Sequence, residues 1–396
     1  MGIELTNEQI FATYKGENWY KSRSKQVFEV SGAAGTGKTY LICYLIERLG
    51  LSYDQVLFVA YMGKAVSQLS RHGLPAKTIH STIYNYKRIP ALTEDGELIF
   101  RSNGKVKMVG VFELKERIGK KIKLIILDEG STVEQKLAED LLSFGIPVIV
   151  LGDLNQLPPP FGNPYFLKNP DVILTKILRQ KEGDPIVWLS QRVLYDEPLN
   201  IGVYGNSAVI SKRDLTDFHL KESDIILTGT NKLRYEFNQY YRDTIKGYKR
   251  LEYPHIGEKV ICRKNNWDRC VDDGIYLTNG TSGIVTYVER ESYNGKSLKI
   301  DFKPDFTKSE LRNLTIDYKR LMTQNLQDLQ PENSNSYFDY TIDVFEYAYA
   351  ITVHSSQGSQ WPNVLFMAER FLNKEDHKKF MYTAITRAMN SLTIVL

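Results

Sequence analysis

A glycine-rich segment near the N-terminus carries residue types that can bind the phosphates of a nucleotide. Residues 32–39 read GAAGTGKT and fit the pattern G-x-x-x-x-G-K-[ST]. Glycines let backbone N–H groups wrap phosphates, Lys38 can reach the β and γ phosphates, and the Thr39 hydroxyl can ligate Mg²⁺. A chance glycine-rich turn is the alternative. The predicted nucleotide-binding residues are Gly32, Ala33, Ala34, Gly35, Thr36, Gly37, Lys38 and Thr39.

Two adjacent carboxylates follow a second apolar run, LIILDEGS, at Asp128 and Glu129. A phosphate loop predicts such a strand, because nucleotide hydrolysis needs a ligand for Mg²⁺ and a base for the attacking water. We expect Asp128 to hold the Mg²⁺ shell and Glu129 to orient and deprotonate that water. Ordinary surface polarity at a strand end is the alternative, which the phosphate loop makes weaker.

A polar amide, Gln156, follows a third apolar run, VIVLGD at 148–153. The carboxyl ends of strands in an open α/β sheet form the ligand-binding edge, so Gln156 is predicted near the same phosphates. There it can sense the γ-phosphate. By itself the segment GDLNQLPP also fits a proline-terminated loop.

The apolar runs that position these residues alternate with amphipathic stretches, which is typical of parallel sheets flanked by helices. An α/β fold with two parallel-sheet domains is therefore predicted. The runs lie at 27–30, 56–61, 124–128, 148–153, 225–230, 347–353, 363–368 and 391–396.

Two stretches break this alternation with short strands and turn signals. One is 87–114, predicted as a small β insertion, and the other contains NGTSGIVTYVE and YNGKSLKIDF, predicted as a compact β module. The predicted division is a first domain of 1–86 and 115–170, the insertion at 87–114, a second domain of 171–255 and 336–396, and the module at 256–335.

The composition is that of a soluble two-domain protein, with 396 residues, 25% of them charged and 42% hydrophobic. No apolar run approaches the roughly 20 residues that cross a bilayer, and the start lacks a signal-peptide pattern, so a cytoplasmic location is expected. The three cysteines are odd in number and do not predict a disulfide framework. The net charge of +4 is compatible with a polyanionic partner but does not establish one.

In this order the motifs resemble those of superfamily 1 DNA helicases of the RecD-like branch, which includes the Dda-type phage helicases, over nearly the whole chain. The resemblance implies two RecA-like domains of the P-loop NTPase class, with an SH3-like β module inserted in the second and entered at NGTSGIV (279–285). LTNEQ (5–9) resembles the adenine-reading motif, which makes Gln9 the implied base contact.

Three segments resemble the family's DNA-contact motifs: VAYMGKAVSQL (59–69), KTIHS (77–81) and AITVHSSQGSQW (350–361). In the third, Gln357 is implied to face the nucleotide, while Trp361 is equally compatible with the core. Structural roles are the alternative, above all for a lone histidine. The implied DNA contacts are Gly63, Lys64, Thr78, His80, Thr352, His354 and Ser355.

Two arginines resemble the pair that the second domain offers to the γ-phosphate, Arg179 in LTKILRQ and Arg387 in YTAITRA. A hydrolysis site between two domains needs positive charge from across the cleft, although a single arginine is most often a surface charge. The family's strand-separating pin would fall in the 87–114 insertion. Phe100 or Ile99 could stack on a base pair there, but we favour ordinary strand packing for both.

The resemblance implies an ATP-dependent DNA helicase that uses Mg²⁺ and acts on single-stranded and forked DNA, with movement from 5′ to 3′. A monomer is expected, serving replication, recombination or repair, with single-stranded DNA-binding or other proteins of those pathways as candidate partners and a bacterial host cell as its location if the source is a phage. A nucleotide-gated DNA-binding switch and a translocase without unwinding remain open. A nuclease is weakly supported, since the sequence shows no second carboxylate cluster. The implied catalytic residues are Lys38, Glu129, Gln156, Arg179 and Arg387.

Overall fold

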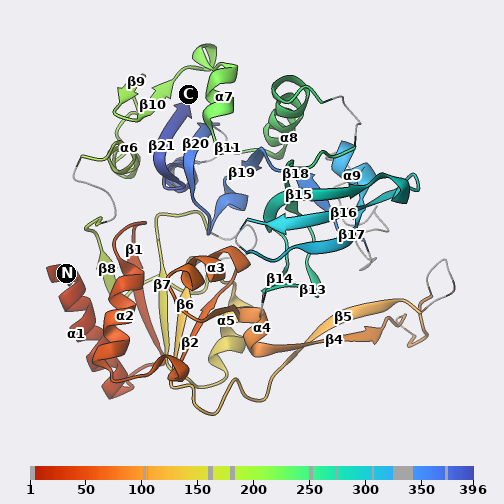
Figure 1. Ribbon diagram of the computed structural model, residues 1–396. Helices are drawn as coiled ribbons and strands as arrows, with labels where there is room; N and C mark the ends of the chain where they lie inside the picture. The colour runs from red at the N-terminus through yellow and green to blue at the C-terminus, as the bar shows by residue number, and fades with distance from the viewer. Residues whose placement is uncertain are drawn as a thin grey trace.

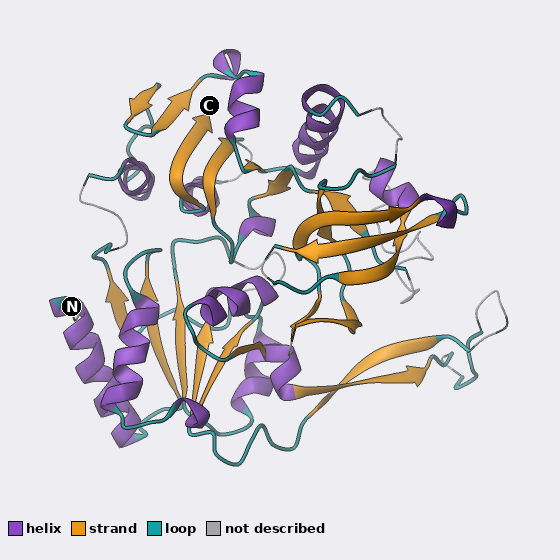
Figure 2. Ribbon diagram, viewed as in Figure 1, coloured by secondary structure: helices purple, strands orange, loops and turns teal. Residues whose placement is uncertain are grey.

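Two α/β domains, an inserted β module and a long hairpin make up the fold (Figures 1 and 2). The computed structural model describes residues 5–93, 95–100, 104, 106–158, 164–178, 183–248, 253–272, 275–305, 307–323, 342–370 and 373–396. Arg179 lies outside these residues. In the described part of the chain, no helix has the length and apolar character needed to span a membrane.

The first domain has a six-stranded sheet of order β3-β2-β6-β7-β1-β8, in which every pairing is parallel. Its strands are β1 (Val27–Gly32), β2 (Val56–Ala60), β3 (Ala76–Thr78), β6 (Leu124–Asp128), β7 (Val148–Gly152) and β8 (Val172–Leu174). Its helices are α1 (Asn7–Ser22), α2 (Lys38–Arg48), α3 (Gly63–Arg71), α4 (Ile79–Ile83) and α5 (Gln135–Leu142).

The edge strand β8 corrects the predicted domain boundary. It pairs with β1, from Val30 with Val172 to Gly32 with Leu174, and so belongs to the first domain. The second domain therefore begins after β8 and not at residue 171. The strand is only three residues long, which gives a sequence pattern too little to detect.

The second domain repeats the parallel arrangement in the order β19-β11-β20-β21-β10-β9, with β9 antiparallel at one edge. Its strands are β9 (Gly202–Tyr204), β10 (Ser207–Ile210), β11 (Ile225–Thr228), β19 (Ala350–Thr352), β20 (Trp361–Met367) and β21 (Ala388–Val395). Its helices are α6 (Pro185–Leu194), α7 (Asp217–Glu222), α8 (Asn231–Tyr240) and α10 (Lys374–Ile385), and a π-helical turn at Tyr241–Ile245 extends α8. The two parallel sheets confirm the predicted α/β class.

A long hairpin, β4 (Tyr84–Pro90) with β5 (Met108–Leu114), projects away from the first domain (Figure 1). It begins at Tyr84 and not at residue 87. Beyond it, Phe100 forms a bridge with Val106 yet is 59% exposed, so strand packing is not its role. Ile99 is half-buried, and its N–H donates to the Ala91 carbonyl at 2.9 Å.

The inserted module is a five-stranded antiparallel sheet of order β17-β16-β15-β12-β18. Its elements are β12 (Lys259–Cys262), β15 (Ser282–Glu289), β16 (Ser297–Pro304), β17 (Leu311–Asp317), α9 (Tyr318–Thr323) and β18 (Phe345–Tyr347), with a separate hairpin of β13 (Asn266–Asp272) and β14 (Ile275–Leu277). The run predicted as one strand at 347–353 is divided, because β18 pairs in the module and β19 in the second domain. The module thus extends past its predicted end at residue 335.

Two buried carboxylates of the module, Glu346 and Glu258, pair with arginines of α8 and of the π-helical turn in the second domain. Glu346 of β18 pairs with Arg234 of α8 and, at 2.6 Å, with Arg263. Arg242 in the π-helical turn donates from Nε to Glu258 at 2.7 Å. Burial acts to raise the pKa of Glu346, but the two arginines outweigh it and lower that pKa to about 2.

Glu346→Gln is expected to lower the free energy of unfolding by about 3–5 kcal/mol at pH 7, because it leaves the buried Arg234 guanidinium without its anion and removes the carboxylate partner of Arg263. The pKa of Glu346 is about 2 in the folded chain against an ordinary value of 4.5. Its contribution is therefore complete above pH 4.5 and is lost as the pH falls toward 2. Urea unfolding measures the effect. Glu113→Gln, which breaks an exposed pair with Lys87, should change little, and equal losses in the two variants would contradict the assignment.

Candidate nucleotide and DNA sites

The predicted phosphate loop joins β1 to α2 at the carboxyl edge of the first sheet. Gly35 and Gly37 have φ angles of +87° and +78°, in the left-handed region that favours glycine. A Cβ on Gly32 would lie 2.6 Å from the Thr36 hydroxyl. The loop therefore needs its glycines, and it leads directly into the start of α2, where backbone N–H groups favour an anion.

Lys38 opens α2 and folds back over the loop, where its Nζ donates to the carbonyls of Gly32 at 2.6 Å and Ala33 at 3.1 Å. Its charge also acts to lower the pKa of Asp128. Thr39 lies beside it in the first turn of α2. The structure thus places Lys38 within the electrostatic influence of the acidic strand end, and its contact with the phosphates stays a prediction.

The acidic pair lies at the end of β6, and β7 separates β6 from the loop strand β1. Burial is the main reason that the pKa values of both Asp128 and Glu129 are raised. The charge of Asp128 raises the Glu129 pKa further, whereas Arg387 and Lys38 act to lower it. Arg387 comes from the second domain, so these charges meet across the cleft between the domains.

The segment after β7 is hydrogen-bonded to the second domain. Gln156 is buried and donates from Nε2 to Asp153 Oδ2 at 3.3 Å. The Leu157 N–H donates to Thr383 Oγ1 at 2.9 Å, and the Gln357 amide donates to the Leu157 carbonyl at 2.6 Å. Gln357, expected to face the nucleotide, thus contacts the segment that follows Gln156.

Arg387 is buried at the end of α10, where its Nε donates to the Thr383 carbonyl at 3.0 Å and its guanidinium also donates to the Ser359 carbonyl at 3.2 Å. These carbonyls hold the guanidinium in place. Its predicted partner Arg179 is not described, but the Leu178 N–H donates to the Gly35 carbonyl at 2.8 Å. The chain just before residue 179 therefore lies against the phosphate loop.

Gln9 is 1% exposed and makes two contacts at the loop. Its Oε1 accepts from the Thr6 N–H at 3.0 Å in a capping box, and its Nε2 donates to the Thr36 carbonyl at 3.1 Å. A cavity of about 450 Å³ lies nearby between the domains, and it is lined in part by Ala34, Ile177 and Tyr382. Its volume is within the range of small-molecule sites, roughly 300–1,000 Å³.

The predicted DNA contacts of the second domain cluster after β19. Thr352 Oγ1 lies 2.9 Å from Ser355 Oγ, which also accepts from Arg263 at 3.1 Å. Burial lowers the pKa of His354, so its ring is neutral near pH 7. Arg263 had no motif to mark it and was missed in the sequence.

Thr78 and His80 have structural contacts. Thr78 caps α4 by accepting from the Ser81 N–H at 3.2 Å. His80 packs against four aromatic rings, and burial lowers its pKa to about 4, so it carries no charge for a phosphate near neutral pH. Those rings are Tyr61, Tyr84, Phe112 and Trp267, from the first domain, the hairpin and the module.

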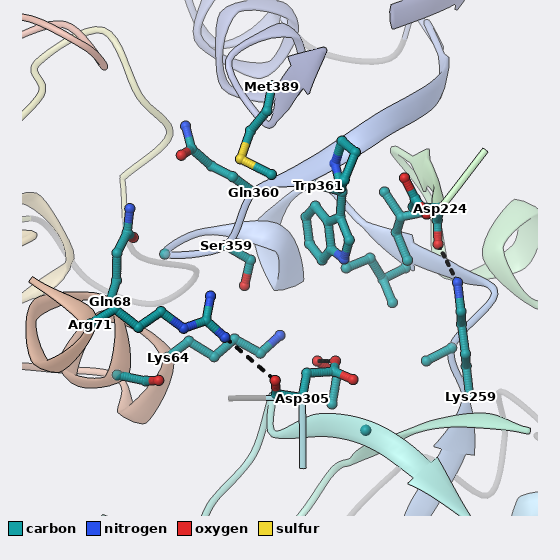
Figure 3. Close-up of a pocket in the computed structure, with 18 residues that line it drawn as sticks. Lys64, Gln68, Arg71, Asp224, Lys259, Asp305, Ser359, Gln360, Trp361 and Met389 are labelled. Carbon is teal, nitrogen blue, oxygen red and sulfur yellow. Dashed lines mark hydrogen bonds between the residues drawn. The ribbon is translucent and has the colours of Figure 1, made fainter. Parts of the chain in front are cut away.

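Lys64 projects into a cavity of about 330 Å³ between α3, the module and the second domain (Figure 3). Its Nζ is buried, finds no hydrogen-bond partner among the described residues and lies 6.0 Å from the centre of the Trp361 ring. Burial lowers the pKa of Lys64 to about 8, with Asp305 acting against the shift. Gly63 beside it is buried, and a Cβ there would lie 3.1 Å from Ile275 of β14.

Comparisons with known proteins match both domains. Residues 18–162 match the AAA domain family, and residues 347–395 match the UvrD-like helicase C-terminal domain. The ATP-dependent RecD2 DNA helicase of Deinococcus radiodurans is 26% identical over 390 residues, which cover 91% of this chain and 45% of that protein. The RecBCD enzyme subunit RecD of Buchnera aphidicola is 23% identical over 427 residues, 92% of this chain and 69% of the subunit.

These matches support the resemblance of the chain to superfamily 1 helicases of the RecD-like branch. This chain spans less than half the length of two of its curated relatives, RecD2 and a Methanocaldococcus jannaschii protein that is 26% identical over 447 residues. The chain has 18% identity and a TM-score of 0.53 to a structure of two coordinating Pif1 helicases at forked double-stranded DNA, and the match covers 99% of this chain and 92% of that one.

A Pif1 helicase from Bacteroides in complex with ADP-AlF3 and single-stranded DNA has 17% identity and a TM-score of 0.51, with the same coverage of 99% and 92%. At this identity the likeness concerns the fold, and it confirms two RecA-like domains of the P-loop class.

Proposed function

We propose that the chain is an ATP-driven DNA helicase that moves along single-stranded DNA from 5′ to 3′ and separates duplex DNA. The observation that carries the proposal is the convergence of the phosphate loop, the acidic pair and Arg387 at one cleft between two parallel-sheet domains. A site divided in this way is completed by closure, so nucleotide turnover can alternate the grip of the two domains on a strand. The RecD2 and RecD relatives are consistent with this activity, and the 5′ to 3′ direction rests on family resemblance.

ATP hydrolysis is assigned to the residues that meet at this cleft. Lys38 would bind the β and γ phosphates, and Glu129 would orient the attacking water and accept its proton. Arg387 would stabilise the negative charge that develops on the γ-phosphate. We assign γ-phosphate sensing to Gln156, and a second cationic contact to Arg179 from the resemblance alone.

The donors near the loop fit a magnesium ion. The Thr39 hydroxyl and the Asp128 carboxylate supply oxygen ligands, which Mg²⁺ prefers, and it usually binds through one or two carboxylates together with phosphates. When bound with ATP, the ion would neutralise part of the phosphate charge. Near Asp128, the Lys38 ammonium would share that task.

We propose that the DNA strand passes over the residues around Ser355 and reaches the cavity that holds Lys64. Arg263, Ser355 and Thr352 form a hydrogen-bonded group at the sheet edge. His80 and its neighbouring rings offer aromatic faces on which bases can stack. The test of the whole proposal is ATP turnover with and without single-stranded DNA, for which we expect strong stimulation by DNA. An ATP turnover rate that is the same with and without single-stranded DNA would contradict the proposal.

Lys64→Met is expected to weaken single-stranded DNA binding and to reduce the slope of log affinity against log salt by about 0.7, the effect of one lost phosphate contact. Since the Lys64 pKa is about 8, the free protein loses this charge as the pH rises through 8. The difference between wild type and variant should therefore narrow at high pH. Fluorescence anisotropy across salt and pH measures both effects. Lys136→Met, at an exposed lysine of α5, serves as the control, and identical salt slopes for wild type and Lys64→Met would remove Lys64 from the DNA site.

Phe100→Ala is expected to slow strand separation by about 5- to 100-fold while DNA-stimulated ATP turnover is retained. Phe100 is exposed beyond the hairpin, and stacking of an aromatic ring on a base contributes about 1–3 kcal/mol. Unwinding and ATP turnover should be measured on the same forked duplex. The matched control is Phe218→Ala, at a phenylalanine of α7 that is 66% exposed. An unchanged unwinding rate would show that Phe100 does not act at the fork.

A further inference from the structure

The side chain of Tyr382 crosses the cleft from the second domain to the first. It lies on α10 and is 1% exposed. Its hydroxyl donates to Asp153 Oδ2 at 2.9 Å, and the residue lines the same cavity as Ala34 of the phosphate loop. One buried side chain therefore links α10 to the segment that follows β7, beside the phosphate loop.

The Asp153 carboxylate connects Tyr382 to Gln156, because it is hydrogen-bonded to both side chains. The Asp153 carboxylate is 1% exposed, and it accepts from Tyr382 and from Gln156 Nε2 on the same oxygen. Its other oxygen accepts from the Asn155 N–H at 3.0 Å. A buried carboxylate requires such donors, so the position of Gln156 depends on a group that Tyr382 helps to hold.

The next residue of α10 reinforces the arrangement. Thr383 accepts from the Leu157 N–H through its hydroxyl and from Arg387 Nε through its carbonyl. The same turn of helix thus carries contacts to the segment after β7 and to the candidate arginine finger. Burial and the neighbouring Asp153 raise the pKa of Tyr382 well above its ordinary value, so the phenol stays protonated and able to donate.

We propose that Tyr382 is a positioning residue for ATP hydrolysis, whose hydroxyl sets the Asp153 carboxylate, and through it the Gln156 amide, against the phosphate loop when the domains meet. The inference rests on the proposed ATPase function and adds to it a residue that senses closure. Tyr382 itself need not touch the nucleotide. Its removal should therefore affect the turnover step more than ATP binding.

The test is Tyr382→Phe, which removes the hydroxyl and keeps the ring. Hydrogen bonds to charged groups contribute about 1.5–3 kcal/mol, so kcat for DNA-stimulated ATP hydrolysis should fall about 10- to 100-fold while KM for ATP changes by less than about 3-fold. Asp153→Asn tests the same contact from the first domain and should also lower kcat. The double variant should be no slower than the worse single variant, because both changes remove one interaction. Tyr195→Phe, at a tyrosine that is 75% exposed, is the control for loss of a phenol hydroxyl.

Wild-type kcat in Tyr382→Phe would overturn the inference, as would losses that multiply in the double variant. Equal changes in kcat and KM accompanied by a lower melting temperature would also overturn it, since they indicate a structural role. Glu129→Gln is assayed in parallel to separate the two proposals. If Glu129→Gln loses ATP hydrolysis and Tyr382→Phe keeps the wild-type rate, only the proposed role of Tyr382 is contradicted. If the wild-type protein shows no DNA-stimulated ATP turnover, the proposed function itself is contradicted.

Discussion

Glu129→Gln should retain ATP binding and lose hydrolysis by about 10²- to 10⁴-fold, the contribution that a positioned general base typically makes. The carboxylate lies beside Asp128 and within the influence of Lys38 and Arg387. Glutamine keeps the size and polarity of the side chain but cannot accept the proton from water. Phosphate release measures the turnover, and a fluorescent ATP analogue measures the binding.

Glu139→Gln provides the matched control, because this glutamate of α5 is exposed and its side chain accepts a hydrogen bond from Gln135 of the same helix. It should hydrolyse ATP at the wild-type rate. Normal ATP turnover in Glu129→Gln would overturn the assignment of Glu129 as the general base. Asp153 would then be the next carboxylate of the cleft to test by substitution.

Arg387→Ala is expected to lower ATP hydrolysis by about 10³-fold or more while DNA affinity is largely retained, as for an arginine finger. Two carbonyls hold the guanidinium in the cleft, and its charge acts on Glu129. Arg387→Lys keeps the charge but loses the planar fork of donors, so it should recover only part of the rate. Single-turnover hydrolysis and DNA anisotropy separate the two effects.

Arg213→Ala, at an exposed arginine of the second domain, should match wild type in both measurements. A loss of only a few fold in Arg387→Ala would make Arg387 a structural charge that satisfies the Thr383 and Ser359 carbonyls. A large loss of DNA affinity would instead assign it to the strand-binding surface.

The sequence predicted the parallel sheets well because the signals of their strands are local. The run LIILD at 124–128 coincides with β6, and the run at 148–153 contains β7. Because β6, β7 and β1 are neighbours in the parallel sheet, their carboxyl ends bring Asp128, Gln156 and the phosphate loop together. Motif and topology therefore agree at this edge.

Contacts between distant segments could not be predicted from pattern alone. Tyr382 and Asp153 are 229 positions apart in the chain, and each lay inside a quoted motif without a role of its own. Lys64 was singled out, but its burial beside Trp361 depends on three parts of the fold. His80 likewise gains its aromatic surroundings only when the hairpin and the module meet.

The sequence pattern also could not predict which side chains of the hairpin region are exposed to solvent. Alternation of apolar and polar residues indicates a strand but not whether a second layer covers it. Phe100 was for that reason expected to pack, and the structure leaves it exposed. Because this exposed aromatic ring lies beyond a projecting hairpin, it could stack on a base at a DNA fork. It is therefore the feature that supports strand separation in addition to DNA-stimulated ATP hydrolysis.

The measurement that tests the central claim most directly is ATP-dependent strand separation on duplexes that carry a single-stranded tail at either the 5′ or the 3′ end, with Glu129→Gln as the inactive control. We expect wild type to separate the duplex with the 5′ tail and to leave the duplex with the 3′ tail intact. Separation from the 3′ tail alone would contradict the direction, and no separation from either tail would contradict the helicase activity itself.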